Sequence, residues 1–220
     1  NNAGDNAIAS NLVLNGGGTL TLSGTNTYTG RTLTAGAGYL VVSQDTNLGA
    51  TPAVPTVDSL IFALNGHLRA TSSFTLDANR GIGIGNSGGG SSSGYFDVLN
   101  NVVLTIDGVI ADRSLNVDGT TTPANTGAVN KTSPGTLVVN GNNTYSGLTT
   151  ISNGILRVGS NTALGTTAGG TIVGTAAHVE LADGIVVTGE TITLSGGNGV
   201  TQPGSPDANR GGLQAAVNAT

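Results

Sequence analysis

Two stretches of the chain, residues 18–49 and 135–165, are copies of one another, and this duplication constrains the fold more than any other feature. The first reads GTLTLSGTNTYTGRTLTAGAGYLVVSQDTNLG and the second reads GTLVVNGNNTYSGLTTISNGILRVGSNTALG. Eight of the first 13 positions are identical, including the run Asn-Thr-Tyr-x-Gly. Such repeats decide a fold, because each copy is one structural unit that buries its apolar face only by stacking on its neighbours.

The alignment of the two copies continues beyond these stretches when single-residue shifts are allowed. The offset is 117 residues at first and becomes 116 after a one-residue gap near Gly38. It returns to 117 at the pair Leu64 and Leu181, and it is 118 at the pair Leu76 and Leu194. A match at nearly constant spacing over this length identifies an internal duplication.

We expect one continuous domain over residues 1–220, built from a repeat at residues 18–134 and a second, incomplete repeat at residues 135–220. The chain contains no methionine, and its second repeat stops well before the counterpart of Pro134. Both features predict that the chain is a piece of a longer protein.

Composition excludes several classes of protein. The net charge is −5, with one lysine and six arginines spread along the chain, whereas nucleic-acid binding needs clustered basic residues. Cysteine is absent, so disulfides and cysteine-ligated metals are excluded. No apolar run approaches the roughly 20 residues of a membrane helix.

Short strands separated by glycine-rich turns predict an all-β fold. Residues 19–23 alternate strictly between polar and apolar side chains, which is typical of a half-buried strand. Such a pattern allows a sandwich, a propeller or a solenoid. The long-period duplication and the small, rarely aromatic core residues favour stacked coils, so we expect a single-stranded parallel β-helix (β-solenoid) of about ten turns. Residues 86–94 and 118–134 are expected to be polar surface loops.

The duplicated motif resembles the autotransporter-associated β-strand repeat, also called the passenger-associated transport repeat. The pattern is GTLxLxGxNTYxG, followed by a threonine-rich strand, Leu-x-Val and a final Leu-Gly. The residues 131–135 resemble the family's lysine-containing lead-in, although its second glycine is missing. The first copy lacks the lysine. The repeat-motif positions are Gly18, Asn26, Thr27, Tyr28 and Gly30 in the first copy, and Gly135, Asn143, Thr144, Tyr145 and Gly147 in the second.

This resemblance implies the passenger domain of a Gram-negative type V autotransporter. Such passengers are mostly right-handed β-helices, which a C-terminal β-barrel translocator exports across the outer membrane to the cell surface. The implied function is a secreted, non-enzymatic stalk that supports adhesion, self-association or biofilm formation, with a role in virulence. Its partner would be a host surface, an extracellular-matrix component or a second passenger. The alternative is a segment that promotes folding and export, or the scaffold of a larger protease or glycan-cleaving enzyme.

Two glycine-rich motifs suggest ligand sites, but their contexts favour loops. Residues 83–88 match GxGxxG, yet a dinucleotide site needs this motif to open a helix, and Gly-Gly-Ser-Ser-Ser-Gly follows instead. Residues 196–200 are similar to a calcium-binding nonapeptide but lack its aspartate. We therefore expect no cofactor and no metal.

A repeated polar motif, Asp-Ala-Asn-Arg-Gly, is the strongest candidate for a ligand contact. It occurs at residues 77–81 and 207–211, and an insertion at residues 195–206 would account for the longer spacing of the second copy. In one interpretation Asp77, Arg80, Asp207 and Arg210 contact a ligand or glycan. In the favoured one, the aspartate caps a turn and the arginine pairs locally.

The remaining candidates favour a structural role. The carboxylates are scattered singly, whereas catalytic carboxylates need a close partner, so we expect no enzymatic activity. The alignment places His67 near Gly184 and not near His178, which predicts two unrelated histidines. Tyr28 and Tyr145 are expected to be packing or turn anchors, with carbohydrate stacking as the alternative.

Overall fold

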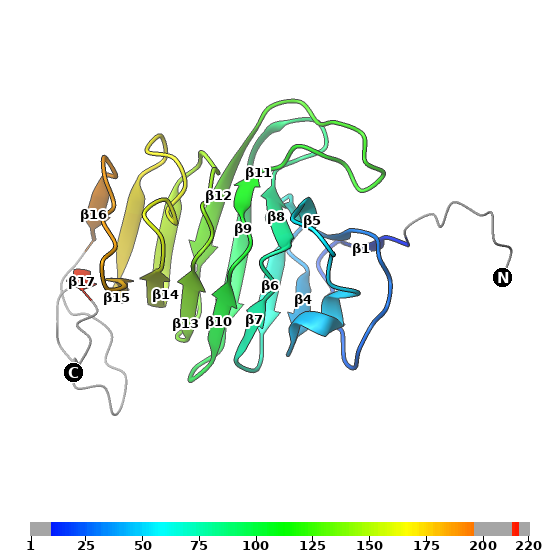
Figure 1. Cartoon of the computed structure of the whole chain (residues 1–220), viewed down its shortest axis with the longest axis horizontal. Coiled ribbons are helices and arrows are strands. Elements are labelled where there is room, and N and C mark those ends of the chain that lie inside the picture. The colour runs from blue at the N-terminus through cyan, green and yellow to red at the C-terminus, as the bar shows by residue number, and fades with distance from the viewer. Residues whose placement is uncertain (1–9, 196–212, 216–220) are drawn as a thin grey trace, which may run out of the picture.

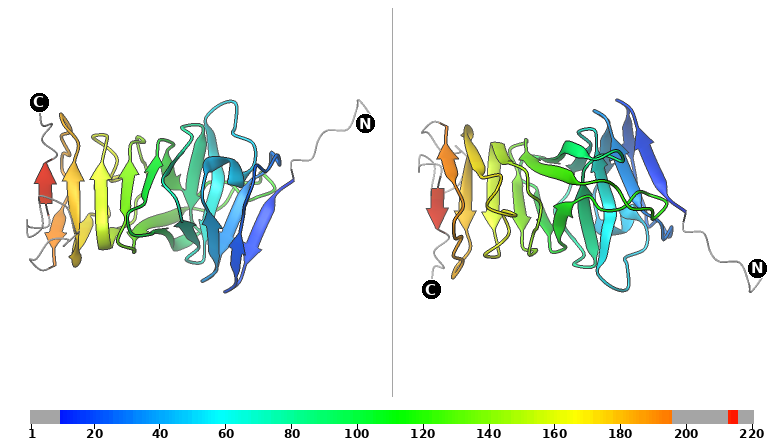
Figure 2. Two further views of the ribbon diagram at one scale, coloured as in Figure 1. Left: turned by 90° about the horizontal axis from the view of Figure 1, so that it is seen from below. Right: turned by 90° about the horizontal axis from the view of Figure 1, so that it is seen from above.

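The computed structural model describes residues 10–195 and 213–215, and in them the chain winds into a parallel β-helix. Successive strands stack along the long axis, from the blue strands at one end to the orange and red strands at the other (Figures 1 and 2). Every pairing between named strands is parallel. The isolated antiparallel bridge between Leu115 and Thr121 lies in a loop. The parallel fold expected from the duplication is confirmed, and the sandwich and propeller are excluded.

The first face of the helix is a separate five-stranded sheet. One strand comes from each of five consecutive turns, and the register pairs residues 12, 32, 60, 82 and 110 in a row. A turn therefore takes 20 to 28 residues here. The strands are β1 (Leu12–Asn15), β3 (Thr32–Ala35), β5 (Thr56–Ala63), β8 (Arg80–Ile84) and β11 (Ile110–Asp112).

The second and third faces form one continuous sheet, because two long strands bend from one face onto the next. These long strands are β14 (Thr149–Val158) and β15 (Thr171–Leu181). The second face also contains β2 (Thr19–Thr21), β4 (Tyr39–Val42), β6 (His67–Ala70), β9 (Gly90–Val98), β12 (Asn125–Lys131) and β16 (Ile192–Leu194). The third face contains β7 (Phe74–Leu76), β10 (Val103–Ile106), β13 (Thr136–Val139) and β17 (Leu213–Ala215), and the 3-10 helix η1 (Asp45–Leu48) lies beside β7.

The core consists of columns of inward-facing side chains, one from each turn. Along the second face, strand pairing stacks eight residues in register: Leu20, Leu40, Leu68, Phe96, Lys131, Ile151, Val173 and Leu194. The described residues thus contribute eight turns to this face, and the expectation of about ten turns applies to all 220 residues. Apolar residues at alternate positions produce such columns, because neighbouring side chains of a strand point to opposite faces.

The two copies of the duplication adopt the same local structure but lie on different faces. The pairing of Leu12 with Thr32 in the first copy recurs as Val129 with Thr149 in the second. The first copy places these strands on the first face, and the second copy places them on the second face. The spacing of 117 residues thus corresponds to four turns and one additional face.

The register corrects the alignment of the later strands. Tyr39 pairs with His67 in the first copy, and the equivalent pair in the second is Ile155 with His178. The offset there is 111 residues, so Leu181 is equivalent to Ala70 and not to Leu64. Leu194, in β16, is likewise equivalent to Ile84 and not to Leu76. Sequence similarity alone misplaced these pairs because small apolar residues match by chance, whereas hydrogen-bond register does not shift freely.

Two segments expected to be loops contain strands. Residues 90–94 of the Gly/Ser tract belong to β9 and pair with residues 125–129 of β12. The latter lie within the second expected loop. In a stacked coil the ladder of the adjacent turn satisfies the backbone, so a strand forms here without large side chains.

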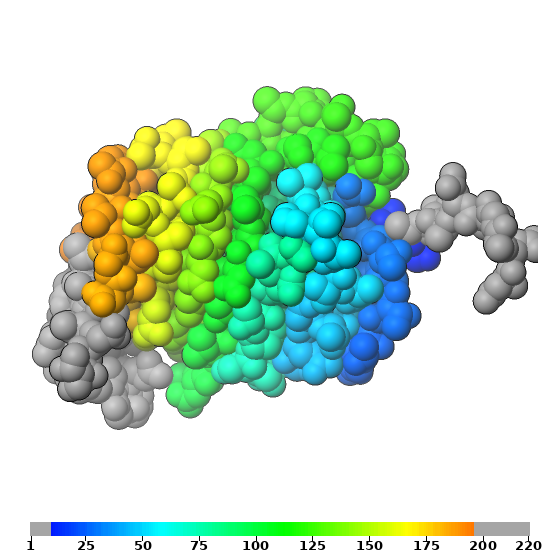
Figure 3. Space-filling view, in the orientation of Figure 1, coloured from blue at the N-terminus to red at the C-terminus, as the bar shows by residue number. Residues whose placement is uncertain are grey.

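An insertion between β11 and β12, residues 113–124, forms a strap over the outside of the first face. It projects at the top of the molecule and reaches toward the N-terminal strands (Figures 1 and 3). Asn11 Nδ2 donates to the carbonyl of Val117 at 2.9 Å. Asp58 fixes the other end of the strap, since its Oδ2 accepts from Ser114 N at 2.9 Å and Leu115 N at 2.6 Å.

Candidate functional site

The repeated tyrosine anchors the corner of each copy through a threonine four residues later. Tyr28 Oη lies 2.8 Å from Thr32 Oγ1, and Tyr145 Oη lies 2.6 Å from Thr149 Oγ1. Tyr145 is only 1% exposed, and burial raises its pKa above the ordinary value for a tyrosine. Burial also raises the pKa of the half-buried Tyr28. These contacts support the interpretation of both tyrosines as packing anchors.

The repeated asparagine connects successive turns. Asn143 is 3% exposed; its Oδ1 accepts from Ile110 N at 2.7 Å and its Nδ2 donates to the Ala163 carbonyl at 2.6 Å. Asn26 makes the second contact at the equivalent position, donating to the Asn47 carbonyl at 2.7 Å. One side chain thus bonds to the turn before and the turn after its own.

The motif glycines allow the turns to approach closely. Gly49 and Gly165 end the two copies with φ values of 83° and 82°, and a Cβ on either would meet the carbonyl oxygen and ring of the repeated tyrosine. A Cβ at Gly30, Gly135 or Gly147 would clash with backbone of the preceding turn, whereas Gly18 has open space around it. The side chains of Thr27 and Thr144 are exposed.

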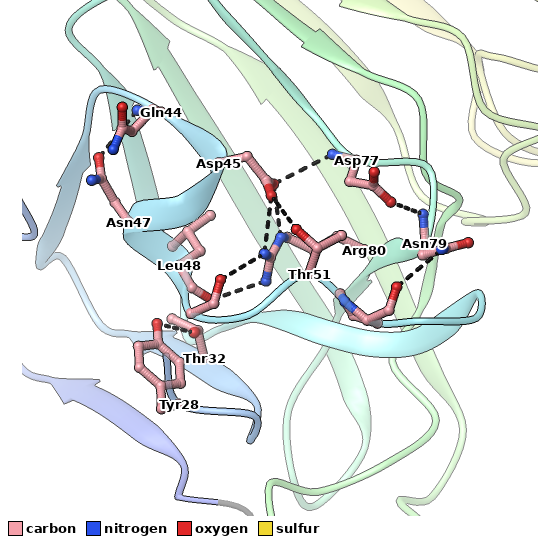
Figure 4. A network of polar contacts seen from close by, with 12 residues as sticks. Tyr28, Thr32, Gln44, Asp45, Asn47, Leu48, Thr51, Asp77, Asn79 and Arg80 are labelled. Atoms are coloured by element: carbon pink, nitrogen blue, oxygen red, sulfur yellow. Dashed lines mark hydrogen bonds and ion pairs between the residues drawn. The ribbon is translucent and has the colours of Figure 1, made fainter. Parts of the chain in front are cut away.

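Arg80 of the repeated polar motif is buried within a network that spans two turns (Figure 4). It is 2% exposed, and its Nε donates to Asp45 Oδ1 at 2.8 Å. Its Nη1 and Nη2 donate to the carbonyls of Leu48 and Gly49 at 2.9 and 3.2 Å. This arrangement fixes η1 to the next turn and leaves the guanidinium little capacity to contact a ligand.

Asp77 caps the turn before Arg80, as in the structural interpretation of the motif. Its Oδ1 accepts from Asn79 N at 2.8 Å, and its carbonyl accepts from Arg80 N at 2.9 Å. The partner of Arg80 is not local, however, since Asp45 lies 35 residues earlier. Asp207 and Arg210 lie outside the described residues.

The two histidines are not unrelated, which corrects the sequence alignment. His67 and His178 occupy equivalent positions on β6 and β15. Each lies beside a carboxylate: His67 Nδ1 is 3.1 Å from Asp97 Oδ2, and His178 Nε2 is 2.9 Å from Glu180 Oε1. The contact with His178, and to a lesser degree those with Arg157, lower the pKa of Glu180.

Lys131, the lysine of the lead-in, is a buried residue whose burial was not predicted from the sequence. It is fully buried in the second-face column, and its Nζ donates to the carbonyls of Ser133 and Asn153, the latter at 3.1 Å. Burial lowers its pKa to about 8, although Asp97 favours the charged form. The strand pattern could have predicted this burial. Residues two apart in a strand point to the same face, so Lys131 points inward together with the buried Val129.

The glycine-rich motifs show no feature of a cofactor site in the described chain. Gly83 lies within strand β8, where a Cβ would clash with Asp58, and no helix follows. Residues 196–200 lie outside the described part. The described residues contain no group of three His, Cys, Asp or Glu side chains suited to a metal. They also contain no helix of the length and apolarity needed to span a bilayer.

Comparison with known protein families identifies the duplicated corners. The model of the passenger-associated-transport-repeat matches residues 12–42 and 129–158. The first match runs from the start of β1 to the end of β4, and the second from within β12 to the end of β14, so each covers more than one turn of the helix. Comparisons with curated proteins and with solved structures gave no match. Residues 12–42 and 129–158 are therefore two passenger-associated-transport repeats, the repeat that occurs in autotransporter passengers.

Proposed function

We propose that this passenger segment is a non-enzymatic stalk at the cell surface that supports adhesion or self-association. One observation carries the proposal: the described carboxylates hold the scaffold together. Asp77 and Asp118 each accept a hydrogen bond from the residue two positions later. The following accept one from a more distant part of the scaffold: Asp45, Asp58, Asp97, Asp107, Asp112, Glu180 and Glu190. Hydrolysis of glycans by a carboxylate pair would need two such groups facing a substrate.

The architecture supports a role in presenting a surface at a distance from the membrane. Apart from the strap at residues 113–124, the turns stack on their immediate neighbours, so such a rod can lengthen by adding turns without changing its cross-section. Partners would be a host surface, an extracellular-matrix component or a second passenger. The translocator would be a C-terminal β-barrel of the full-length protein.

A second candidate function is promotion of folding and export, and the corners of the repeats favour it. The second matched segment contains a corner at which Asn143 and Tyr145 are both buried and hydrogen-bonded. Such a corner is suited to nucleate a helix that forms turn by turn, because Tyr145 bonds within its own turn and Asn143 bonds only to the adjacent turns.

The test compares cells that display the full passenger with cells whose passenger lacks residues 18–194. Loss of clumping and of surface binding, with display unchanged, is the result expected of an adhesive stalk. Loss of display would support the export function and contradict the stalk. The Asn143→Ala variant is a matched control, since it weakens a buried corner without changing an exposed side chain. A stalk predicts normal clumping per displayed molecule in this variant, whereas an export element predicts reduced display.

A further inference from the structure

The outer side of the second face carries a column of three aromatic rings. Tyr39, His67 and Tyr95 come from the adjacent strands β4, β6 and β9, and strand pairing places them directly in register. The His67 ring lies 4.5 Å from Tyr39 and 4.4 Å from Tyr95, between ring centroids. The chain has only seven Phe and Tyr residues and no Trp, so this column is a local concentration of side chains that are rare elsewhere.

Arg69 lies beside this column and has no carboxylate partner among the described residues. Its Cζ lies 4.0 Å above the ring of Tyr39, and its buried Nε has no hydrogen-bond partner. Asp97 is the residue directly opposite on β9. Oppositely charged residues in this arrangement normally pair, so the absence of a pair needs an explanation.

The explanation is that Asp97 is engaged elsewhere. Its Oδ1 accepts from Thr132 Oγ1 at 2.5 Å and Ser133 Oγ at 3.1 Å, and its Oδ2 contacts His67. The charge of Asp97 also favours the ammonium form of Lys131 inside the core. The negative charge of Asp97 is therefore compensated by Thr132, Ser133, His67 and the buried Lys131. The positive charge of Arg69 remains available at the surface.

Another arginine of the scaffold does pair with the carboxylate directly opposite it. Arg157 and Glu180 are direct register partners on β14 and β15. Arg157 donates to Glu180 Oε2 from both Nε and Nη2, at 2.9 and 2.7 Å. Glu180 contacts His178 through Oε1 and keeps Oε2 for Arg157. Both oxygens of Asp97 have other partners, so Arg69 is left unpaired.

We propose that Tyr39, His67, Arg69 and Tyr95 form a binding site for an acidic saccharide, with the guanidinium of Arg69 holding the sugar carboxylate. The planar fork of an arginine matches a carboxylate in a bidentate arrangement, and stacking on Tyr39 fixes the plane of the fork. The hydroxyls of Tyr39 and Tyr95 and the Nε2 of His67 have no hydrogen-bond partners among the described residues. They supply a row of polar groups, one from each turn, for sugar hydroxyls. This site rests on the proposed function and names the ligand class through which the stalk adheres.

A saccharide fits this surface better than a peptide. Peptides usually bind by adding a strand to a free sheet edge or by inserting side chains into a groove. Strands β4, β6 and β9 are paired on both sides, so they have no free edge. Recognition on this face must come from side chains alone, and their chemistry here is polar, hydroxylic and cationic.

The experiment measures binding of the 220-residue chain to polygalacturonate by titration calorimetry at low salt. The same backbone with its carboxylates methyl-esterified is the uncharged control ligand. We expect binding to polygalacturonate and weak or no binding to the ester. Arg69→Gln should weaken binding by about tenfold or more, the effect of losing hydrogen bonds to a charged group. Arg157→Gln, which removes the same charge from the paired position, should bind as the wild type does.

Two other variants test the geometry. Arg69→Lys keeps the charge but loses the fork, and Tyr39→Phe keeps the ring but loses the hydroxyl; both should weaken binding, the first more strongly. Unchanged melting temperatures show that the variants fold. Equal weakening by Arg69→Gln and Arg157→Gln would show non-specific attraction and overturn the site, as would equal binding of the ester. Absence of binding with clumping of displaying cells intact would overturn the site and leave the stalk function standing.

Discussion

Lys131 and Phe96 are direct register partners in the same inward-facing column, and both side chains are fully buried. A lysine in an apolar column is costly because burial disfavours its charge. Its Nζ bonds to the carbonyls of Ser133 and Asn153, at a corner where the backbone turns and leaves these acceptors inside. The lead-in lysine of the repeat thus donates hydrogen bonds, from inside the core, to corner carbonyls that would otherwise lack a partner.

Stability should rise with pH between about 8 and 10.5 because of Lys131. Its pKa is lowered to about 8 in the folded chain, from 10.5. In this range the unfolded chain binds the proton more tightly, so raising the pH favours the folded state, by about 3 kcal/mol in total. Above about pH 10.5 the trend should reverse, since the raised pKa of Tyr145 means that the unfolded chain loses this proton first. Urea unfolding at a series of pH values measures the slope.

The Lys131→Met variant is the control for this pH dependence. It removes the buried charge but leaves two carbonyls without a donor, so the two effects on stability at pH 7 oppose each other. The predicted signature is the loss of the rise between pH 8 and 10. A variant that retains the full slope would show that another group is responsible.

Asn143→Ala should destabilise the chain more than Asn26→Ala. The first substitution leaves the Ile110 amide and the Ala163 carbonyl without partners inside the core, at a cost of about 2–4 kcal/mol. The second removes one contact at a less buried corner and should cost about 1 kcal/mol. Denaturant unfolding of both variants tests the order, and equal losses would contradict the two-sided role of Asn143.

Arg80→Met should destabilise the chain by about 3 kcal/mol or more, because it leaves the carboxylate of Asp45 without its charged partner and two corner carbonyls without their donor. The double variant Asp45→Asn, Arg80→Met should recover part of this loss, since no uncompensated charge remains. A thermal-unfolding cycle of the wild type, both single variants and the double variant measures the coupling. Additive effects would mean that the ion pair contributes little.

The sequence was sufficient to predict the fold because the features that determine it are local and repeated. Alternation in the strands, glycine at the corners and the motif around Tyr28 and Tyr145 all recur in the second copy. The interpretation of Asp77 as a turn cap needed only neighbouring residues. Predictions of this kind depend on contacts within one turn.

Contacts between turns could not be predicted, because they depend on the number of residues in each turn. The turns vary from 20 to 28 residues along the first face, so the partner of Arg80 and the equivalence of His67 with His178 were not visible. The strap fixed by Asp58 is a further case, since its carboxylate bonds to Ser114, 56 residues later. No short-range pattern identifies such a pair.

Deleting residues 18–134 should give a shorter β-helix without a break. The deletion joins Gly17 to Gly135, and these flank equivalent strands, because β1 before the junction has the register of β12. The Asn-Thr-Tyr corner, β14 and β15 then follow β1 as they now follow β12. We expect a folded chain with the β-sheet circular dichroism spectrum and one cooperative unfolding transition.

The matched control is a deletion of equal length that joins two positions that are not equivalent in the repeat. Removing residues 60–176 joins Ser59 to Ala177 and omits the first-face strand of that turn together with its corner. The chain would then enter β15 on the wrong face and expose its apolar column. We expect aggregation or loss of cooperative unfolding in this variant. Equal behaviour of the two deletions would contradict the register, since length alone would then decide whether the remaining turns can stack.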